Sequence, residues 1–145
     1  MKTVIQRVKK ASVSVDGVTC GSIDNGYVVL AGFGAEDDKK KVESAVDKIH
    51  KLRIFQDDGG KTNLSIGDVK GGLLIISQFT LYADCKKGNR PSFVNAAGPD
   101  KANELYEYFI ECAEGRFEKV AHGVFGAYMQ VELINDGPFT VILES

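Results

Sequence analysis

The amino-acid sequence predicts an α+β fold in which a curved, barrel-like and mostly antiparallel sheet has two helices packed on it. Strand-like segments outnumber helical ones, and the two helical segments do not alternate strictly with strands. The 145 residues contain no internal repeat, linker or low-complexity tract. A single domain spanning residues 1–145 is therefore expected, and a chain of this length can bury one sizeable core.

The N-terminal part is predicted to consist of short strands joined by tight turns. Ser12 and Ser14 alternate with Val13 and Val15, as in a strand with one buried face. Asp-Gly and Asn-Gly dipeptides are typical of two-residue hairpin turns. The expected order is strands at residues 3–8 and 11–15, turns at Asp16-Gly17 and Asn25-Gly26, and an apolar strand at residues 27–33.

Two segments have helical periodicity. In residues 37–52 the apolar side chains fall on one face: Val42, Ala45, Val46, Ile49 and Leu52. Asp37 and Asp38 suit the first turn of this helix, because negative charge is favourable near a helix N-terminus. A second helix is expected at about residues 99–115, with Gly115 as its stop.

The remaining segments predict strands. Residues 53–55 are short and extended, and the turn residues 57–60 end them. Gly71-Gly72 precedes Leu73-Leu74-Ile75-Ile76, four consecutive aliphatic residues that predict a fully buried central strand. Residues 119–143 predict two or three further strands.

Composition favours a cytoplasmic globular protein. The 43% hydrophobic and 26% charged content is ordinary for that class. No run approaches the ~18 apolar residues of a membrane helix, and the N-terminus has Arg7 but no apolar signal-peptide core, so no membrane partner is expected. Cys20, Cys85 and Cys112 are widely spaced without a CxxC motif, which indicates free thiols in a reducing cytosol.

The charge distribution gives a weak indication of nucleic-acid binding. A net charge of −2 argues against an extensive phosphate-binding surface. Two local clusters of cations remain: Lys86, Lys87 and Arg90, and Arg7, Lys9 and Lys10. Each cluster is also compatible with an ordinary solvated surface.

The C-terminal segment contains an unusual dipeptide, Gly137-Pro138, between two apolar β-runs at residues 129–134 and 139–143. Proline cannot donate a ladder hydrogen bond, and glycine before it leaves the backbone free to adopt unusual angles. Such a pair can turn two carbonyls toward a ligand, and carbonyls can accept hydrogen bonds from an ammonium group. The simpler alternative is a plain turn between two hairpin strands.

A second motif, Ser77-Gln78-Phe79-Thr80, follows the predicted central strand directly. Polar groups at the end of a buried strand are held by a rigid scaffold, which suits chemistry. The simpler alternative is that Ser77 and Thr80 only satisfy local backbone groups.

Other catalytic constellations are scarce. No His, Cys, Asp or Glu grouping has metal-ligand spacing, and there is no GxSxG or phosphate-binding glycine loop, so neither a metal nor another cofactor is expected. Cys85 could be a thiol nucleophile, but nothing nearby in the sequence supplies a base. His122 could be a general base, although a structural histidine is the simpler interpretation.

Taken together, the motifs resemble those of the D-aminoacyl-tRNA deacylases nearly from end to end. One departure is Phe139, where the family more often has a smaller aliphatic residue. The matching segments are Val4-Ile5-Gln6-Arg7-Val8, Lys51-Leu52-Arg53-Ile54-Phe55, Ser77-Gln78-Phe79-Thr80-Leu81-Tyr82-Ala83-Asp84, Lys87-Gly88-Asn89-Arg90-Pro91-Ser92-Phe93, Gly123-Val124-Phe125-Gly126-Ala127 and Asn135-Asp136-Gly137-Pro138.

The resemblance implies a homodimer with the active site at the subunit interface, and hydrolysis of the ester bond of D-aminoacyl-tRNA. It places the catalytic groups at Ser77, Gln78, Phe79 and Thr80, with the backbone N–H groups around Gln78, Phe79 and Thr80 stabilising the oxyanion. The substrate's own hydroxyl, or a water that it orients, completes the reaction. Thr80 as a covalent nucleophile is the rival mechanism, but no adjacent base is evident. Lys86, Lys87 and Arg90 are expected to contact the tRNA acceptor end.

The resemblance also implies chiral selection by a Gly137-Pro138 pair with a cis peptide bond. Its carbonyls would capture the α-amino group and occupy the space that an L side chain needs. Arg7 and Met129 are expected to support the pair from behind. Glycyl-tRNA has no side chain to exclude, so its hydrolysis is an expected side reaction.

Two other functions compete with this one. A degenerate relative could bind the acceptor end without turnover, although the intact motifs argue against degeneracy. A small-molecule esterase unrelated to RNA is also compatible with the net charge of −2.

Overall fold

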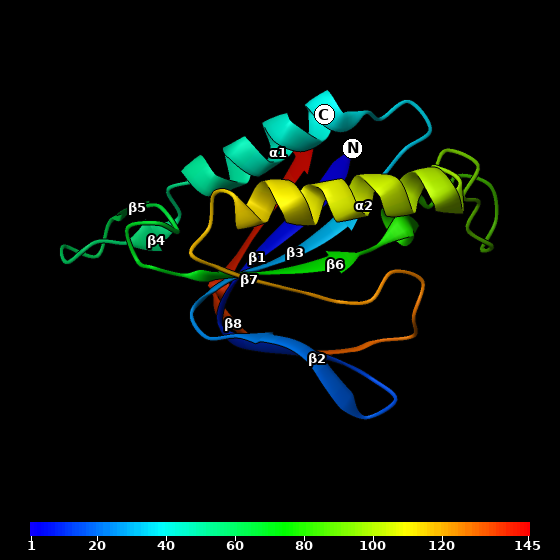
Figure 1. Ribbon diagram of the computed structural model, residues 1–145. Helices are drawn as coiled ribbons and strands as arrows, with labels where there is room; N and C mark the ends of the chain where they lie inside the picture. Colours follow the sequence, from blue (N-terminus) through cyan, green and yellow to red (C-terminus); the bar gives the residue numbers. More distant parts are fainter.

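The computed structural model describes residues 1–145 and confirms the predicted class: two helices lie side by side on one face of a strongly curved sheet (Figure 1). The elements in chain order are β1 (Lys2–Val15), β2 (Val18–Ile23), β3 (Gly26–Gly32), α1 (Lys39–Lys51), β4 (Phe55–Gln56), β5 (Thr62–Leu64), β6 (Gly72–Ser77), the 3-10 helix η1 (Phe79–Tyr82), α2 (Pro99–Glu114), β7 (Lys119–His122) and β8 (Gln130–Glu144).

The main sheet has the order β2-β1-β3-β6-β7, and β8 pairs with β1. β1 is antiparallel to β2, β3 and β8, whereas β3–β6 and β6–β7 are parallel. The sheet curls until β2 approaches β7: a Cβ added at Gly21 would lie 3.0 Å from the carbonyl oxygen of His122. This approach gives the sheet its barrel-like shape.

β1 is a single long strand rather than the two strands predicted at residues 3–8 and 11–15. Its first half pairs with β3 and its second half with β2, while β8 pairs with both halves. This long-range pairing holds the polar stretch at Lys9 and Lys10 in an extended conformation, which local pattern could not show. The predicted turn is present at Asp16-Gly17, where both residues have positive φ, 49° and 78°.

The helices begin and end close to their predicted limits, with one correction. α1 begins at Lys39, because the side chain of Asp38 accepts a hydrogen bond from the N–H of Lys41 and caps the helix. Asp37, predicted in the first turn, instead lies before the helix and is buried. α2 begins at Pro99, and Gly115 caps its C-terminus as expected.

The core has two parts, one on each face of the sheet. A larger cluster of 22 buried residues lies between the sheet and the helices, and a smaller one of 7 lies inside the curl of the sheet. Leu73 and Ile75 of β6 belong to the first, and Leu74 and Ile76 belong to the second. The continuous apolar run therefore arises because β6 is covered on both faces. None of the helices has both the length and the apolar character needed to span a membrane.

Candidate functional site

The Gly137-Pro138 pair lies in a bulge within β8, so the hairpin-turn alternative is wrong. Gln6 pairs with Thr140 and Val8 pairs with Asn135, so residues 136–139 (the β8 bulge) stand opposite the single residue Arg7. The Gly137–Pro138 peptide bond is cis, as expected, and both residues are exposed.

Arg7 contacts the β8 bulge from the core side. Its side chain is buried, and its Nε donates to the carbonyl oxygen of Asp136 at 3.0 Å. Its Nη1 donates to the carbonyl oxygen of Ile54 at 2.5 Å. The Cζ atom of Arg7 lies 5.0 Å from the ring centroid of Phe139. The unusual Phe139 thus packs on the guanidinium directly behind Gly137-Pro138.

Met129 lies far from the β8 bulge within the chain. It precedes β8, and residues 130–136 separate it from Gly137, which corresponds to more than ~20 Å at ~3.3 Å per strand residue. Its sulfur packs against Gly123, where an added Cβ would lie 2.5 Å from Sδ. The expectation that Met129 supports Gly137-Pro138 therefore fails within one chain, because an extended strand holds the two apart.

A pocket of about 880 Å³ opens at the end of β6 and is lined mainly by hydrophobic residues. Its walls come from η1, the start of α2 and the segment before β8. The residues of its lining with predicted roles are Ser77, Gln78, Phe79, Thr80 and Met129. Phe93 and Tyr128 also line it, and no sequence pattern had singled out Tyr128, because a lone aromatic residue in a loop has no periodic signal.

The backbone at Gln78–Thr80 offers two N–H groups, not three. The N–H of Gln78 donates to the carbonyl oxygen of Ala31 at 2.8 Å, so it is unavailable to a substrate. Phe79 and Thr80 are the first two residues of η1, and their N–H groups have no acceptor within that helix. The side-chain amide of Gln78 donates to the Thr80 hydroxyl.

The pocket contains no candidate general base. Tyr128 is the only titratable residue in its lining, and no carboxylate or histidine reaches it. His122 lies outside the lining, with its Nδ1 2.9 Å from the carbonyl oxygen of Gly123. Cys85 is exposed on the loop after η1 and also lies outside the lining. The structure therefore gives Thr80 no neighbour that could remove its proton.

The cations Lys86, Lys87 and Arg90 lie on a loop beside the pocket. The loop is closed by two backbone hydrogen bonds between Asp84 and Ser92, of 2.8 and 2.9 Å. All three cations are exposed, and none forms an ion pair within the chain. The loop leads directly into Phe93, whose ring centroid lies 4.9 Å from that of Phe79 in the pocket wall.

One chain does not bring the two motifs together. Ser77 pairs with Ala31, Ala31 with Thr3, and Thr3 with Leu143, whereas the β8 bulge lies opposite Arg7. The motifs are thus ~13 Å apart along the strands and about 14 Å apart across them. Gly137 and Pro138 are absent from the pocket lining.

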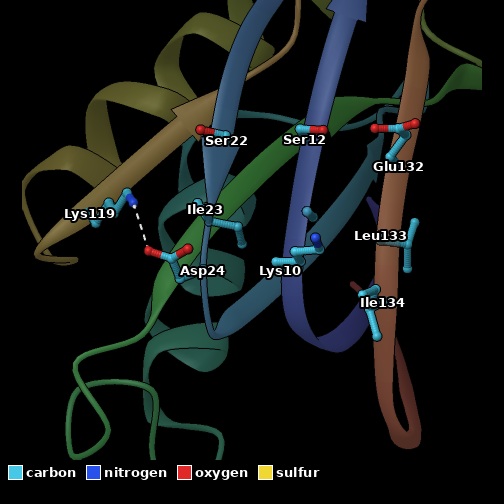
Figure 2. A pocket seen from close by; sticks show the side chains of 10 residues that line it. Lys10, Ser12, Ser22, Ile23, Asp24, Lys119, Glu132, Leu133 and Ile134 are labelled. Carbon is cyan, nitrogen blue, oxygen red and sulfur yellow. Dashed lines mark ion pairs between the residues drawn. The ribbon is translucent and has the colours of Figure 1, made fainter.

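A second pocket, of about 500 Å³, lies on the outer surface of β1, β2, β7 and β8 (Figure 2). Its lining is mixed, with Ser12, Ser22 and Glu132 beside Leu133 and with an ion pair of 3.8 Å between Lys119 and Asp24. Of the residues in the predicted motifs and cation clusters, only Lys10 lines it. No group of three or more His, Cys, Asp or Glu side chains that could hold a metal ion occurs in the structure.

The sequence matches, over residues 4–144, the family described as D-Tyr-tRNA(Tyr) deacylase. The chain belongs to this family. It is 53% identical to the D-aminoacyl-tRNA deacylase of Thermosipho africanus (strain TCF52B) and 54% identical to that of Fervidobacterium nodosum (strain ATCC 35602 / DSM 5306 / Rt17-B1). Both alignments span 100% of this chain and 97% of the relative. Membership of the D-Tyr-tRNA(Tyr) deacylase family makes the chain an enzyme of the hydrolase class.

Solved structures share the fold of this family member. A c-Myc DNA unwinding element binding protein superposes with a TM-score of 0.95 at 42% identity, covering 100% of this chain and 99% of its own. A probable eukaryotic D-amino acid tRNA deacylase superposes with a TM-score of 0.82 at 18% identity, covering 98% of this chain and 97% of its own. The second likeness shows the fold alone.

Proposed function

We propose that this member of the deacylase family hydrolyses the ester bond of D-aminoacyl-tRNA and releases the free D-amino acid and the tRNA. The observation that supports this most directly is an apolar pocket with two backbone N–H groups at its wall and no general base. Such a pocket suits an activated ester, which needs less from protein side chains than an amide does. Both bacterial relatives are named for this activity.

In the proposed mechanism, the N–H groups of Phe79 and Thr80 stabilise the oxyanion that forms on the ester carbonyl. Pre-organised donors of this kind contribute ~3–4 kcal/mol each. A water oriented by the free hydroxyl of the terminal ribose attacks the carbonyl carbon. The carbon–oxygen bond to the ribose then breaks, the water oxygen stays on the amino acid, and a proton passes to the ribose oxygen.

Thr80 as a nucleophile is the weaker alternative. Its hydroxyl accepts a hydrogen bond from the Gln78 side chain, and no base lines the pocket. A hydroxyl without a base is a poor nucleophile at neutral pH.

Chiral selection is proposed to come from a second copy of the chain. Gly137 and Pro138 are exposed and remote from their own pocket, so they are available to enter the pocket of a partner. Their carbonyls would capture the α-amino group and fill the space that an L side chain needs. Met129 lines the pocket and would then contact the incoming pair. A glycyl ester has no side chain to exclude, so glycyl-tRNA is also a substrate.

The surface of β8 supports a homodimer. β8 pairs only with β1, which leaves one edge of a 15-residue strand unpaired. Ile134 and Ile142 on this strand are 50% and 65% exposed. Sedimentation at micromolar concentration is expected to show a dimer; a fully active monomer would contradict the proposal.

Lys86, Lys87 and Arg90 are proposed to bind phosphates of the tRNA acceptor end, because their loop flanks the pocket and leaves all three cations unpaired. The tRNA substrate and the exposed thiols of Cys20 and Cys85 support a cytoplasmic location.

One assay distinguishes the proposed function from its competitors. It compares release of D-tyrosine from D-tyrosyl-tRNA with release from a simple D-tyrosine ester, with L-tyrosyl-tRNA as the stereochemical control. Turnover of D-tyrosyl-tRNA alone is expected. Binding without turnover would indicate an acceptor-end binding protein, and equal turnover of both D esters would indicate a small-molecule esterase.

A further inference from the structure

A buried carboxylate, Asp37, lies beneath the helix η1 that forms the pocket wall. Only 3% of Asp37 is exposed, and it accepts hydrogen bonds from four separate segments. Its Oδ1 accepts from the Met1 ammonium at 2.6 Å and from Lys41 Nζ at 3.0 Å. Its Oδ2 accepts from the Gly34 N–H at 2.6 Å and from the Tyr82 hydroxyl at 3.1 Å.

Tyr82 is the last residue of η1, and its ring contacts Gly34 and the side chain of Lys2. Gly34 lies so close that an added Cβ would be 2.8 Å from the ring carbon Cε1 and from the hydroxyl oxygen. The Lys2 ammonium lies 5.4 Å from the ring centroid. Together with the hydrogen bond from the Tyr82 hydroxyl to Asp37, these contacts fix the C-terminal end of η1.

The other end of η1 is fixed by β3, through the hydrogen bond from the Gln78 N–H to Ala31. Between the two ends, η1 has no buried residue. Leu81 is half-buried against Gly32 and the Phe79 ring contacts Phe93, so apolar contacts also help to hold η1. The polar contacts at Gln78 and Tyr82 tie its two ends, one on each side of the Phe79 and Thr80 N–H groups.

We propose that Asp37 and Tyr82 are positioning residues for the deacylase reaction: their hydrogen bond holds η1 so that the Phe79 and Thr80 N–H groups face the forming oxyanion. This inference rests on the proposed function. Oxyanion donors act because they are already in place when charge develops. A displacement of about 1 Å caused by a distant substitution can cost ~10²-fold in rate.

The charges of the two groups suit this role at neutral pH. Burial raises the pKa of the Asp37 carboxyl, but hydrogen bonds from the Met1 ammonium, Gly34 and Lys41 outweigh it, so that its pKa lies below the ordinary value. Burial, together with the neighbouring Asp37 and Glu144, raises the pKa of Tyr82. Asp37 therefore stays a charged acceptor and Tyr82 stays a neutral donor.

The decisive variant is Tyr82→Phe, which keeps the ring against Gly34 and removes only the hydroxyl. We expect kcat for D-tyrosyl-tRNA to fall roughly 10- to 100-fold, while KM changes less than about twofold, because the lost alignment matters in the transition state. The matched control is Tyr108→Phe. Tyr108 also donates its hydroxyl to a carboxylate, that of Glu43, but on the exposed surface of the two helices. The kcat of Tyr108→Phe should stay within about twofold of the wild-type value.

Hydrogen exchange of the backbone amides of residues 79–83 gives a second readout that is independent of activity. Exchange in this segment should be faster in Tyr82→Phe and unchanged in Tyr108→Phe. If the wild type is active and Tyr82→Phe keeps its kcat, the inference is wrong even if the melting temperature falls. A loss of kcat with unchanged exchange would also overturn it. If the wild type does not hydrolyse D-tyrosyl-tRNA, the proposed function fails, and unchanged exchange would then reject the positioning role separately.

Discussion

The pocket wall at Ser77–Thr80 and the β8 bulge at Gly137-Pro138 differ in how the chain supports them. The first follows β6, a strand that is covered on both faces, and is tied to β3 by a backbone hydrogen bond; its lining comes from the same chain. In the second, Gly137 and Pro138 are exposed on β8, whose outer edge has no partner strand, and Arg7 supports them from one side only. The pocket wall is thus assembled from one chain, whereas the exposure of the bulge is consistent with the proposal that it acts on a second copy.

The largest expected effect concerns the support of the β8 bulge. Arg7→Ala removes a buried cation and leaves the carbonyl oxygens of Asp136 and Ile54 without their donor. The free energy of unfolding should fall by about 3 kcal/mol in urea denaturation. Arg7 Nε also lies 3.3 Å from the Asp136 carboxylate. Lys9→Ala is the matched control, since Lys9 Nζ lies 3.4 Å from that carboxylate but the Lys9 side chain is 63% exposed. Its effect should stay below ~0.5 kcal/mol. Equal losses in both variants would show that the bulge does not depend on Arg7.

The second prediction concerns the pocket wall. Thr80→Ala should keep activity within roughly a hundredfold of the wild type, because the backbone N–H of residue 80 is retained. Loss of a covalent nucleophile would lower kcat by nearer ~10⁶-fold. Single-turnover kinetics measures the difference. Mass spectrometry of the quenched wild-type reaction provides the opposing test, since an acyl group trapped on Thr80 would establish the nucleophilic mechanism.

The third prediction tests whether chiral selection depends on the β8 bulge, rather than on the strain that alanine causes at any glycine with positive φ. Gly137→Ala places a Cβ 2.9 Å from the Phe139 nitrogen at a φ of +132°, so the bulge must rearrange. Discrimination between D- and L-tyrosyl-tRNA should fall at least ~10-fold, which corresponds to a loss of about 1.4 kcal/mol in selectivity. Gly60→Ala is the control, because Gly60 also has positive φ, +76°, but nothing lies within 4 Å of its added Cβ. Unchanged discrimination in Gly137→Ala would locate chiral selection elsewhere.

The smallest expected effect is on the affinity of the protein for tRNA and on the salt dependence of that affinity. Lys86→Ala or Lys87→Ala should weaken tRNA binding and reduce the slope of log K against log salt by about one unit per lost phosphate contact. Filter binding at several salt concentrations measures this slope. An unchanged slope in both variants would assign these lysines to a solvated loop.

The sequence by itself determined both helices, the central strand and both motifs. The run at Leu73–Ile76 predicted the buried central strand, and apolar periodicity predicted both helices to within about two residues. These features depend on local side-chain pattern, which is available from one chain. The Ser-Gln-Phe-Thr motif and the Gly137-Pro138 pair, taken in order along the chain, were enough to indicate the family.

Only the tertiary structure decided where the motifs lie and which groups surround them. It joined two predicted strands into β1, placed Gly137-Pro138 in a bulge opposite Arg7, and moved Met129 from that bulge to the pocket. In the folded chain the Gln78 N–H donates to the carbonyl oxygen of Ala31, and Asp37 is buried just before helix α1 rather than in its first turn. The physical reason is common to all of these: each depends on which backbone group or charge meets which partner across strands distant in sequence, and local periodicity contains no information about that partner.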